Sequence, residues 1–279
     1  MKLGINSYTF MWAIGFQGVN PAYPDKSARP KYPLTPLGLL EKACALGEHL
    51  VQTGPNLPLE RMPAADLDVF IKTTQDYGIR LELGTRGLDP EHLVKQAAFA
   101  KSIGATLIRT IPELNGEPIT DVQAALPVIR SLLPMLEGEG LRLAIENGRI
   151  PAGDLRGFLD EVDNPHIGVV LDMVNSLAVP EGWKEVTRQL APHTMCVHYK
   201  DFTMRRAWHM MGFLCEGTPC GKGLLEPEWL FEALKVSPYD YNVIIELWPA
   251  EQETLEDTIS LEQQWAEESV QFLRKYVQD

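Results

Sequence analysis

The chain has 279 residues, 45% of them hydrophobic, and a formal net charge of −13 at pH 7. This charge argues against proteins that bind nucleic acid or an anionic membrane surface, because both kinds of binding depend on clustered lysine and arginine. The four cysteines form no C-x-x-C pair and are too sparse for a disulfide-stapled secreted domain. We therefore expect a cytoplasmic protein whose partner is a small molecule.

The first apolar segment, residues 8–16 (YTFMWAIGF), follows Lys2, as the apolar part of a secretory signal would. Polar residues at Asn6, Ser7 and Thr9 interrupt it, however, and no small-x-small cleavage pattern follows. No stretch of the sequence approaches the length of a membrane span. We predict a first strand that runs into a loop, and no membrane partner.

Strand-like runs and amphipathic stretches alternate along the whole chain. The predicted strands are residues 2–8, 49–54, 79–85, 106–112, 141–147, 167–173, 194–201 and 242–248. Eight predicted helices accompany them, and several end on a glycine just before the next strand, as at Gly78, Gly104 and Gly140. Repeated strand–helix units without a linker predict an α/β fold, a single (β/α)8 TIM barrel over residues 1–279.

Two features depart from this regular repeat. Pro127 and Pro134 fall inside the helix predicted over residues 121–140, which predicts a kink or a break there. The segments over residues 9–35 and 202–225 are much longer than the other connections. Both follow the carboxyl end of a predicted strand, and that face carries the active site in TIM barrels.

Four ligand-type side chains stand near the ends of four consecutive predicted strands. They are Glu146, Asp172, His198 and Glu246. Because side chains alternate along a strand, the residues that share their face are Ala144, Val170, Cys196 and Ile244, which suit a packed inward layer. We predict that the four ligand-type side chains converge on one point at the barrel mouth.

A structural explanation exists for each of these side chains taken alone. A buried carboxylate can cap a helix or form half of an ion pair, and a lone histidine is often a satisfied core residue. Three carboxylates with one imidazole are harder to explain in this way, because burial and mutual repulsion destabilise them without a cation. We therefore predict one bound divalent metal ion, with Mn²⁺ favoured and Mg²⁺, Co²⁺ or Zn²⁺ as alternatives.

The motifs IEN, VLDMVN, VHYKD, GTPCGKG and IIELW resemble those of the sugar phosphate isomerase/epimerase superfamily, whose barrels are xylose isomerase-like. The layout is similar to that of the ketose 3-epimerases. The resemblance implies that Glu146, Asp172, His198 and Glu246 hold the metal and that the two glutamates also act as catalytic acid and base. Ketose 3-epimerases usually place a histidine where this chain has Asn175, and the arginine expected after the metal histidine corresponds to Arg205 or Arg206.

The same superfamily includes metal-dependent apurinic endonucleases, which bind three zinc ions. Those enzymes carry further histidine ligands where this chain has Asn175, the TGPN stretch and GTRG. No basic groove accompanies the acidic composition, so we expect no nucleic-acid partner.

One metal ion between two glutamates suits proton transfer next to the carbonyl of a keto-sugar or related polyol. We predict that further residues near strand ends bind the substrate, although each also has a structural alternative. These residues are Asn6, Arg109, Glu113, Asn147, Asn175, Lys200, Arg205 and Trp248. For Lys200 the alternative is an ion pair with a nearby carboxylate. The glycine-rich GTPCGKG lacks the P-loop pattern and is weak evidence for phosphate.

Three functions remain open from the sequence. The first is an isomerase or epimerase of a keto-sugar, and the second is a metal-dependent lyase, such as a dehydratase acting on a keto-inositol. The third is a sugar-binding barrel without catalysis, against which the four ligand-type residues argue. Proton removal next to a carbonyl begins both catalytic reactions, so the sequence does not separate them. A homo-oligomer is also left open.

Overall fold

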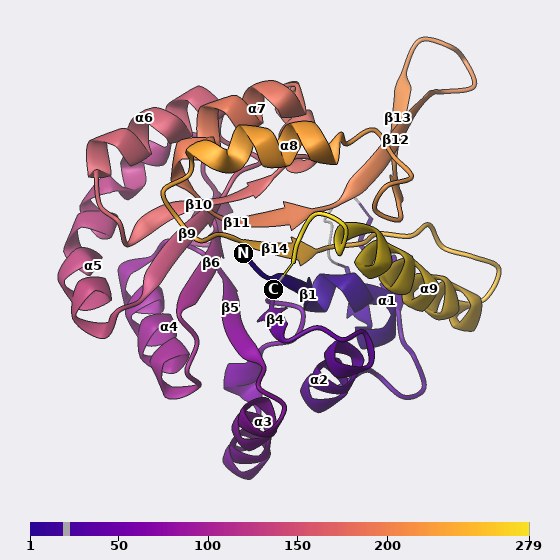
Figure 1. The fold of residues 1–279 in the computed structure, drawn as a ribbon, viewed down its shortest axis with the longest axis horizontal. Coiled ribbons are helices and arrows are strands. Elements are labelled where there is room, and N and C mark those ends of the chain that lie inside the picture. Colours follow the sequence, from indigo (N-terminus) through magenta and orange to yellow (C-terminus); the bar gives the residue numbers. More distant parts are fainter. Residues whose placement is uncertain (19–22, 279) are drawn as a thin grey trace. The chain divides into compact units, whose positions relative to one another are not determined.

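The computed structural model describes residues 1–18 and 23–278. Eight strands form a closed barrel in the order β1-β14-β11-β10-β9-β6-β5-β4 (Figure 1). They are β1 (Leu3–Asn6), β4 (Leu50–Thr53), β5 (Arg80–Arg86), β6 (Leu107–Ile111), β9 (Arg142–Glu146), β10 (Ile167–Asp172), β11 (Thr194–Tyr199) and β14 (Asn242–Ile245). The predicted TIM barrel is confirmed.

The helices follow the strands in the predicted alternation. They are α1 (Met11–Ile14), α2 (Pro36–Ala45), α3 (Ala64–Asp76), α4 (Pro90–Ser102), α5 (Leu126–Glu139), α6 (Ala152–Val162), α7 (Trp183–Leu190), α8 (Pro227–Ala233) and α9 (Leu255–Leu273). None of the described helices is both long and apolar enough to cross a membrane.

Local sequence explains where several of these helices begin and end. Thr35 caps α2 by accepting a hydrogen bond from the Gly38 amide, and Thr254 caps α9 in the same way. Gly78, Gly104 and Gly140 have φ values of 63°, 75° and 65°, a left-handed conformation that ends a helix at little cost for glycine. Of the two prolines that predict a kink or a break, Pro127 lies in the first turn of α5, after a 3-10 helix over Val122–Ala125, whereas α5 continues through Pro134.

The chain divides into two compact units. The first comprises Met1–Lys2, Arg80–His198 and Glu228–Ile244, and the second comprises Leu3–Ile79, Tyr199–Pro227 and Ile245–Asp279. The sequence-based prediction of one domain over residues 1–279 therefore stays a prediction.

The first unit is built on strands β9, β10 and β11, which are parallel neighbours. Every residue of β10 and β11 is buried, as expected for strands covered by helices on their outer face. Helices α4, α5, α6 and α7 pack against one another in chain order (Figure 1). Ala144, Val170 and Cys196 are fully buried below the ends of these strands, where the sequence places a packed layer.

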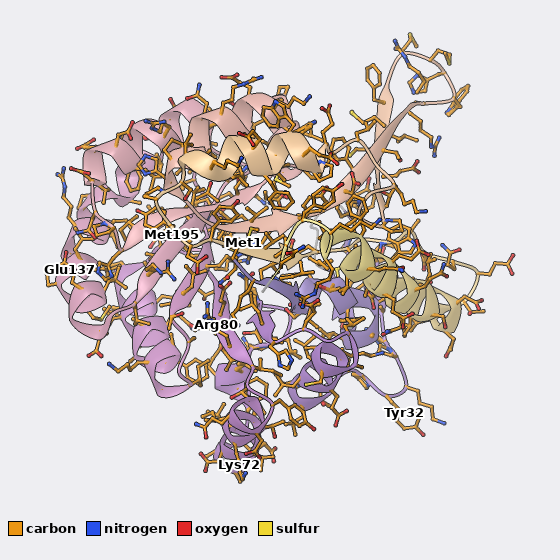
Figure 2. The ribbon with its side chains drawn as sticks, viewed as in Figure 1. Met1, Tyr32, Lys72, Arg80, Glu137 and Met195 are labelled. Atoms are coloured by element: carbon orange, nitrogen blue, oxygen red, sulfur yellow. The ribbon has the colours of Figure 1, made fainter. Side chains whose placement is uncertain are left out.

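The second unit contains both of the long segments that the sequence singles out. After β1, the chain forms a short antiparallel pair of β2 (Phe16–Gln17) and β3 (Ser27–Ala28), with residues 19–22 outside the described part. After β11, it forms the hairpin of β12 (Asp201–Arg206) and β13 (Phe213–Thr218). Within this unit, Tyr32 is 82% exposed and points away from the ribbon in Figure 2, as does Lys72.

A buried carboxylate joins α9 to α1 in the second unit. Glu262 of α9 accepts hydrogen bonds from the backbone amides of Trp12, at 2.8 Å, and Ala13, at 3.0 Å. Burial raises the pKa of Glu262 to about 8, although the two amides and Lys42 act in the opposite direction. This glutamate therefore takes up a proton on folding at neutral pH.

We expect this proton uptake to make stability depend on pH. An unfolded glutamate ionises near pH 4.5, so between pH 4.5 and 8 the folded chain binds one more proton than the unfolded chain. The Glu262 contribution to the free energy of unfolding should thus fall as the pH rises through this range, by at most about 1.4 kcal/mol per pH unit. Urea denaturation at pH 5.5 and 8 should show a smaller fall for Glu262→Gln than for the wild type.

The control for this experiment is Glu267→Gln, which changes an exposed glutamate of the same helix and should keep the wild-type pH dependence. Equal pH dependence in Glu262→Gln and the wild type would show that Glu262 is already ionised in the folded chain.

Candidate metal centre

Three of the predicted ligands lie together in the first unit. Glu146 is the last residue of β9, Asp172 is the last residue of β10, and His198 lies near the end of β11. Each offers one ligand atom, and these atoms all lie within 4.8 Å of one another. All three side chains are buried, with exposures of 4%, 0% and 0%.

Strand register brings the three side chains to one face. Asp172 pairs with His198 across β10 and β11, whereas Glu146 pairs with Val170, two residues before Asp172. A two-residue step keeps Asp172 on the same face as Val170 and hence as Glu146. The β10–β11 register shifts between Val169 and Val170, and this shift sets His198, rather than Val197, beside Asp172.

Asp172 is held by the backbone that follows it and by one asparagine. Its Oδ1 atom accepts hydrogen bonds from the amides of Val174, at 2.8 Å, and Asn175, at 3.0 Å. The Asn147 side chain bonds both backbone groups of Asp172, since its Oδ1 accepts from the amide at 2.7 Å and its Nδ2 donates to the carbonyl at 2.8 Å. Asn147 therefore joins the end of β9 to the end of β10.

Glu146 is held at both carboxylate oxygens. Asn175 Nδ2 donates to Oε1 at 2.6 Å, and the buried Arg109 donates through Nε to Oε2. His198 Nδ1 lies 3.4 Å from the same Oε2 atom. The guanidinium compensates the buried carboxylate charge, and the two donors restrict the rotation of the side chain. Asn175 thereby links the two carboxylates, through its backbone amide to Asp172 and its side chain to Glu146.

The donor set fits a divalent cation. Two carboxylates and one imidazole within 4.8 Å are ligand types that Mn²⁺, Mg²⁺ and Zn²⁺ share. The Glu146 carboxylate is also oriented by Arg109 and Asn175, and such outer contacts are a regular feature of metal sites.

The fourth predicted ligand, Glu246, follows β14 and is described within the second unit. It is 4% exposed, and Lys200 Nζ lies 2.9 Å from its Oε2 atom. Asn6 Nδ2 donates to Oε1 at 3.0 Å and to Gln52 at 2.7 Å. The ion-pair alternative for Lys200 is thus present in the structure. The place of Glu246 in the ligand set stays a prediction.

Of three further residues predicted to bind substrate, two have charged partners and the third lines a cavity. Glu113 accepts a hydrogen bond from Arg86 at 2.6 Å within the first unit. In the second unit, Arg205 binds Glu216 through two hydrogen bonds on the exposed hairpin. Trp248 lines a cavity of about 590 Å³ together with Trp12, Phe16 and Trp265. Their roles in substrate binding stay predictions.

A pocket of about 260 Å³ adjoins the cluster within the first unit. Its lining includes Arg86, Glu146, Asn147, Gly148, Arg149 and Asn175. The two arginines are absent from the residues that the sequence singles out. The available signal was their place just after predicted strands, in GTR and ENGR.

We expect Asn175→Ala to weaken metal binding, because Glu146 would lose the donor that orients its Oε1 atom. Loss of such an outer contact typically costs about 10–100-fold in metal affinity. Isothermal titration of the metal-free protein with Mn²⁺ measures this affinity directly.

Asn164→Ala is the matched control. Asn164 also donates a hydrogen bond to a glutamate, Glu137, at a distance of 2.8 Å, but neither residue belongs to the cluster. Its Mn²⁺ affinity should equal that of the wild type. If Asn175→Ala also binds Mn²⁺ as tightly as the wild type does, then Asn175 does not support the metal site.

Comparison with known proteins identifies relatives over nearly the whole chain. The family profile described as xylose isomerase-like TIM barrel matches residues 13–276. A 3-oxo-isoapionate decarboxylase from Pectobacterium atrosepticum is 30% identical over 275 residues, covering 98% of this chain and 95% of that protein.

Solved structures show the same fold at lower identity. A D-psicose 3-epimerase from Clostridium cellulolyticum H10, solved with D-tagatose, has a TM-score of 0.68 and 16% identity. The match covers 100% of this chain and 100% of that chain. A barrel protein from Mycobacterium smegmatis in complex with magnesium has a TM-score of 0.66 and 16% identity, covering 96% of this chain and 97% of that one. The profile, the curated relative and the barrel agree, and the chain belongs to the xylose isomerase-like TIM barrel family.

Proposed function

We propose that this protein is a metal-dependent lyase that removes CO₂ from a 3-oxo acid derived from a sugar. The observation that carries the proposal is the 30% identity, over 98% of the chain, to a 3-oxo-isoapionate decarboxylase. The proposed reaction is a lyase reaction, like the dehydratase alternative that the sequence leaves open, but it releases CO₂ in place of water.

The reaction needs one bond broken and one proton supplied. The bond between the carboxyl carbon and the neighbouring carbon breaks, CO₂ leaves, and the electron pair moves onto the oxygen of the 3-oxo group to give an enolate. A bound divalent ion would supply Lewis-acid stabilisation of the charge on that oxygen. A proton then adds to the carbon that has lost CO₂, and a group of the protein must deliver it.

The protein contributes orientation and the proton. Arg109 and Asn175 hold the Glu146 carboxylate at both oxygens, so this ligand is positioned before substrate binds. We assign the proton to Lys200, whose Nζ lies 2.9 Å from Glu246 Oε2 and whose side chain is 14% exposed and can therefore exchange protons with solvent. Glu246 is proposed as the fourth ligand because, like Glu146 and Asp172, it stands at the carboxyl end of a strand.

We further propose Mn²⁺ as the resident ion and the cytoplasm as the compartment. The donor set is mostly oxygen with one nitrogen, which suits Mn²⁺. All four cysteines are free thiols, as expected in a reducing compartment.

A keto-sugar isomerase or epimerase is the second candidate. The observation in its favour is the order Glu146, Asp172, His198 and Glu246 along the chain, with a glutamate at each end of the set to serve as acid and base. Asn175 argues against this candidate, because it occupies the position of the histidine usual in ketose 3-epimerases and donates a hydrogen bond to Glu146.

The two candidates give different products from the Mn²⁺-loaded protein. Incubation in D₂O with a panel of 3-oxo sugar acids, keto-sugars and keto-inositols should release CO₂ from an acid and place deuterium on the carbon that lost it. Mass spectrometry of the products checks this, since an epimer keeps the mass of its substrate apart from deuterium and a dehydratase product loses water. An epimer formed from a keto-sugar, with no CO₂ from any acid, would assign the second candidate.

Loss of a metal ligand should abolish turnover of whichever substrate is found. We expect Asp172→Asn to lower kcat/KM by more than about 100-fold, since a direct ligand matters at least as much as the outer contacts that support it. Chelator should abolish the wild-type activity and added Mn²⁺ should restore it. Asp76→Asn, at an exposed acid paired with Lys72, is the control and should stay fully active. Activity that survives both chelation and Asp172→Asn would be incompatible with a metal-dependent reaction.

A further inference from the structure

We infer that Arg149 recognises an anionic group of the substrate, a carboxylate or a phosphate, in the pocket beside Glu146. The inference rests on the proposed function in taking this pocket as the substrate site. It adds a binding residue, and a requirement for an acidic substrate, that the metal cluster alone does not imply.

The charges of the pocket leave Arg149 uncompensated. The Glu146 carboxylate is matched by Arg109, and Arg86 is matched by Glu113 at 2.6 Å. Within residues 1–18 and 23–278, by contrast, Arg149 makes no hydrogen bond, ion pair or ring contact. Because Arg149 also lines the pocket beside Glu146, an anionic ligand bound there is placed to supply the missing partner.

The backbone before Arg149 is shaped to bring it to the pocket. Gly148 has a φ of 151°, and a Cβ atom there would lie 2.8 Å from Cβ of Asn175. Only glycine lets the chain pass so close to the residue that holds Glu146. Asn147 fixes the chain on one side of this turn through Asp172, and the fully buried Ile150 fixes it on the other.

Each of the four residues from Glu146 to Arg149 thus has its own role. Glu146 is a predicted metal ligand, Asn147 joins two strand ends, Gly148 provides clearance, and Arg149 lines the pocket that Glu146 also lines. A substrate could therefore meet the metal site and the guanidinium at the same time. The arginine side chain is exposed, so an incoming anion need not displace an existing partner.

The pocket and the guanidinium together indicate the ligand class. A volume of about 260 Å³ is smaller than the usual drug-sized site and suits a compact metabolite. The planar guanidinium donates two parallel hydrogen bonds to a carboxylate or a phosphate, whereas a neutral hydroxyl offers no matching charge. The substrate is accordingly a small sugar derivative that carries an acidic group.

The test measures binding rather than turnover. The Mn²⁺-loaded protein is titrated calorimetrically with three four-carbon probes: D-erythronate, erythritol 4-phosphate and the neutral erythritol. We expect at least one anion to bind about 10-fold or more tighter than erythritol, as charge-assisted hydrogen bonds predict. Preference for erythronate identifies a carboxylate site, and preference for the phosphate identifies a phosphate site.

Substitution then assigns the preference to Arg149. Arg149→Ala should weaken the preferred anion by about 10–100-fold, with Arg149→Lys intermediate because it keeps the charge and loses the fork. Affinity for Mn²⁺ should be unchanged in both. Arg130→Ala is the control, since Arg130 is an exposed arginine of the same unit, paired with Glu161.

The possible outcomes separate this inference from the proposed function. The inference is overturned if Arg149→Ala binds the anion as tightly as the wild type does. It is also overturned if the wild type binds erythritol as tightly as both anions. Weaker anion binding in Arg149→Ala supports it, even if no acid loses CO₂. CO₂ release with an unchanged KM in Arg149→Ala supports the lyase and overturns the role of Arg149.

Discussion

The first unit depends on the burial of two carboxylates and one imidazole within 4.8 Å of one another. Such burial is unfavourable unless every charge and lone pair finds a partner. Arg109 and Asn175 hold Glu146, and two backbone amides hold Asp172. These contacts join the middle of β6, the end of β9 and the turn after β10, so these three segments cannot shift independently.

This constraint links the metal centre to substrate binding. Asn175 contacts both carboxylates, and Gly148 passes against Asn175, so the turn that carries Arg149 is packed on the support of the metal ligands. A side chain added at Gly148 would therefore disturb the metal ligands, whereas the exposed side chain of Arg149 can change without moving them. In the second unit, Glu246 is held in a comparable way by Lys200 and Asn6.

Proteins that share this fold are named for different reactions. Relatives of similar fold are named as epimerases, whereas the curated relative is named as a decarboxylase. All of these reactions place negative charge on an oxygen next to the reacting carbon, and one cation site can stabilise that charge. Specificity then depends on residues around the site, and in this chain Asn175 and Arg149 line the pocket beside Glu146.

The barrel and the strand ends that carry Glu146, Asp172 and His198 could be predicted from the sequence, because the alternation of apolar runs and the glycine helix stops are local properties. The contacts between these ends could not, because they depend on how distant segments pack together. The register shift between Val169 and Val170 sets His198 beside Asp172, and the pairing of Arg109 with Glu146 joins residues 37 positions apart. The pairing of Arg86 with Glu113 and the place of Arg149 in the pocket were likewise hidden, since neither charge compensation nor a close backbone passage at Gly148 leaves a periodic signal in a sequence.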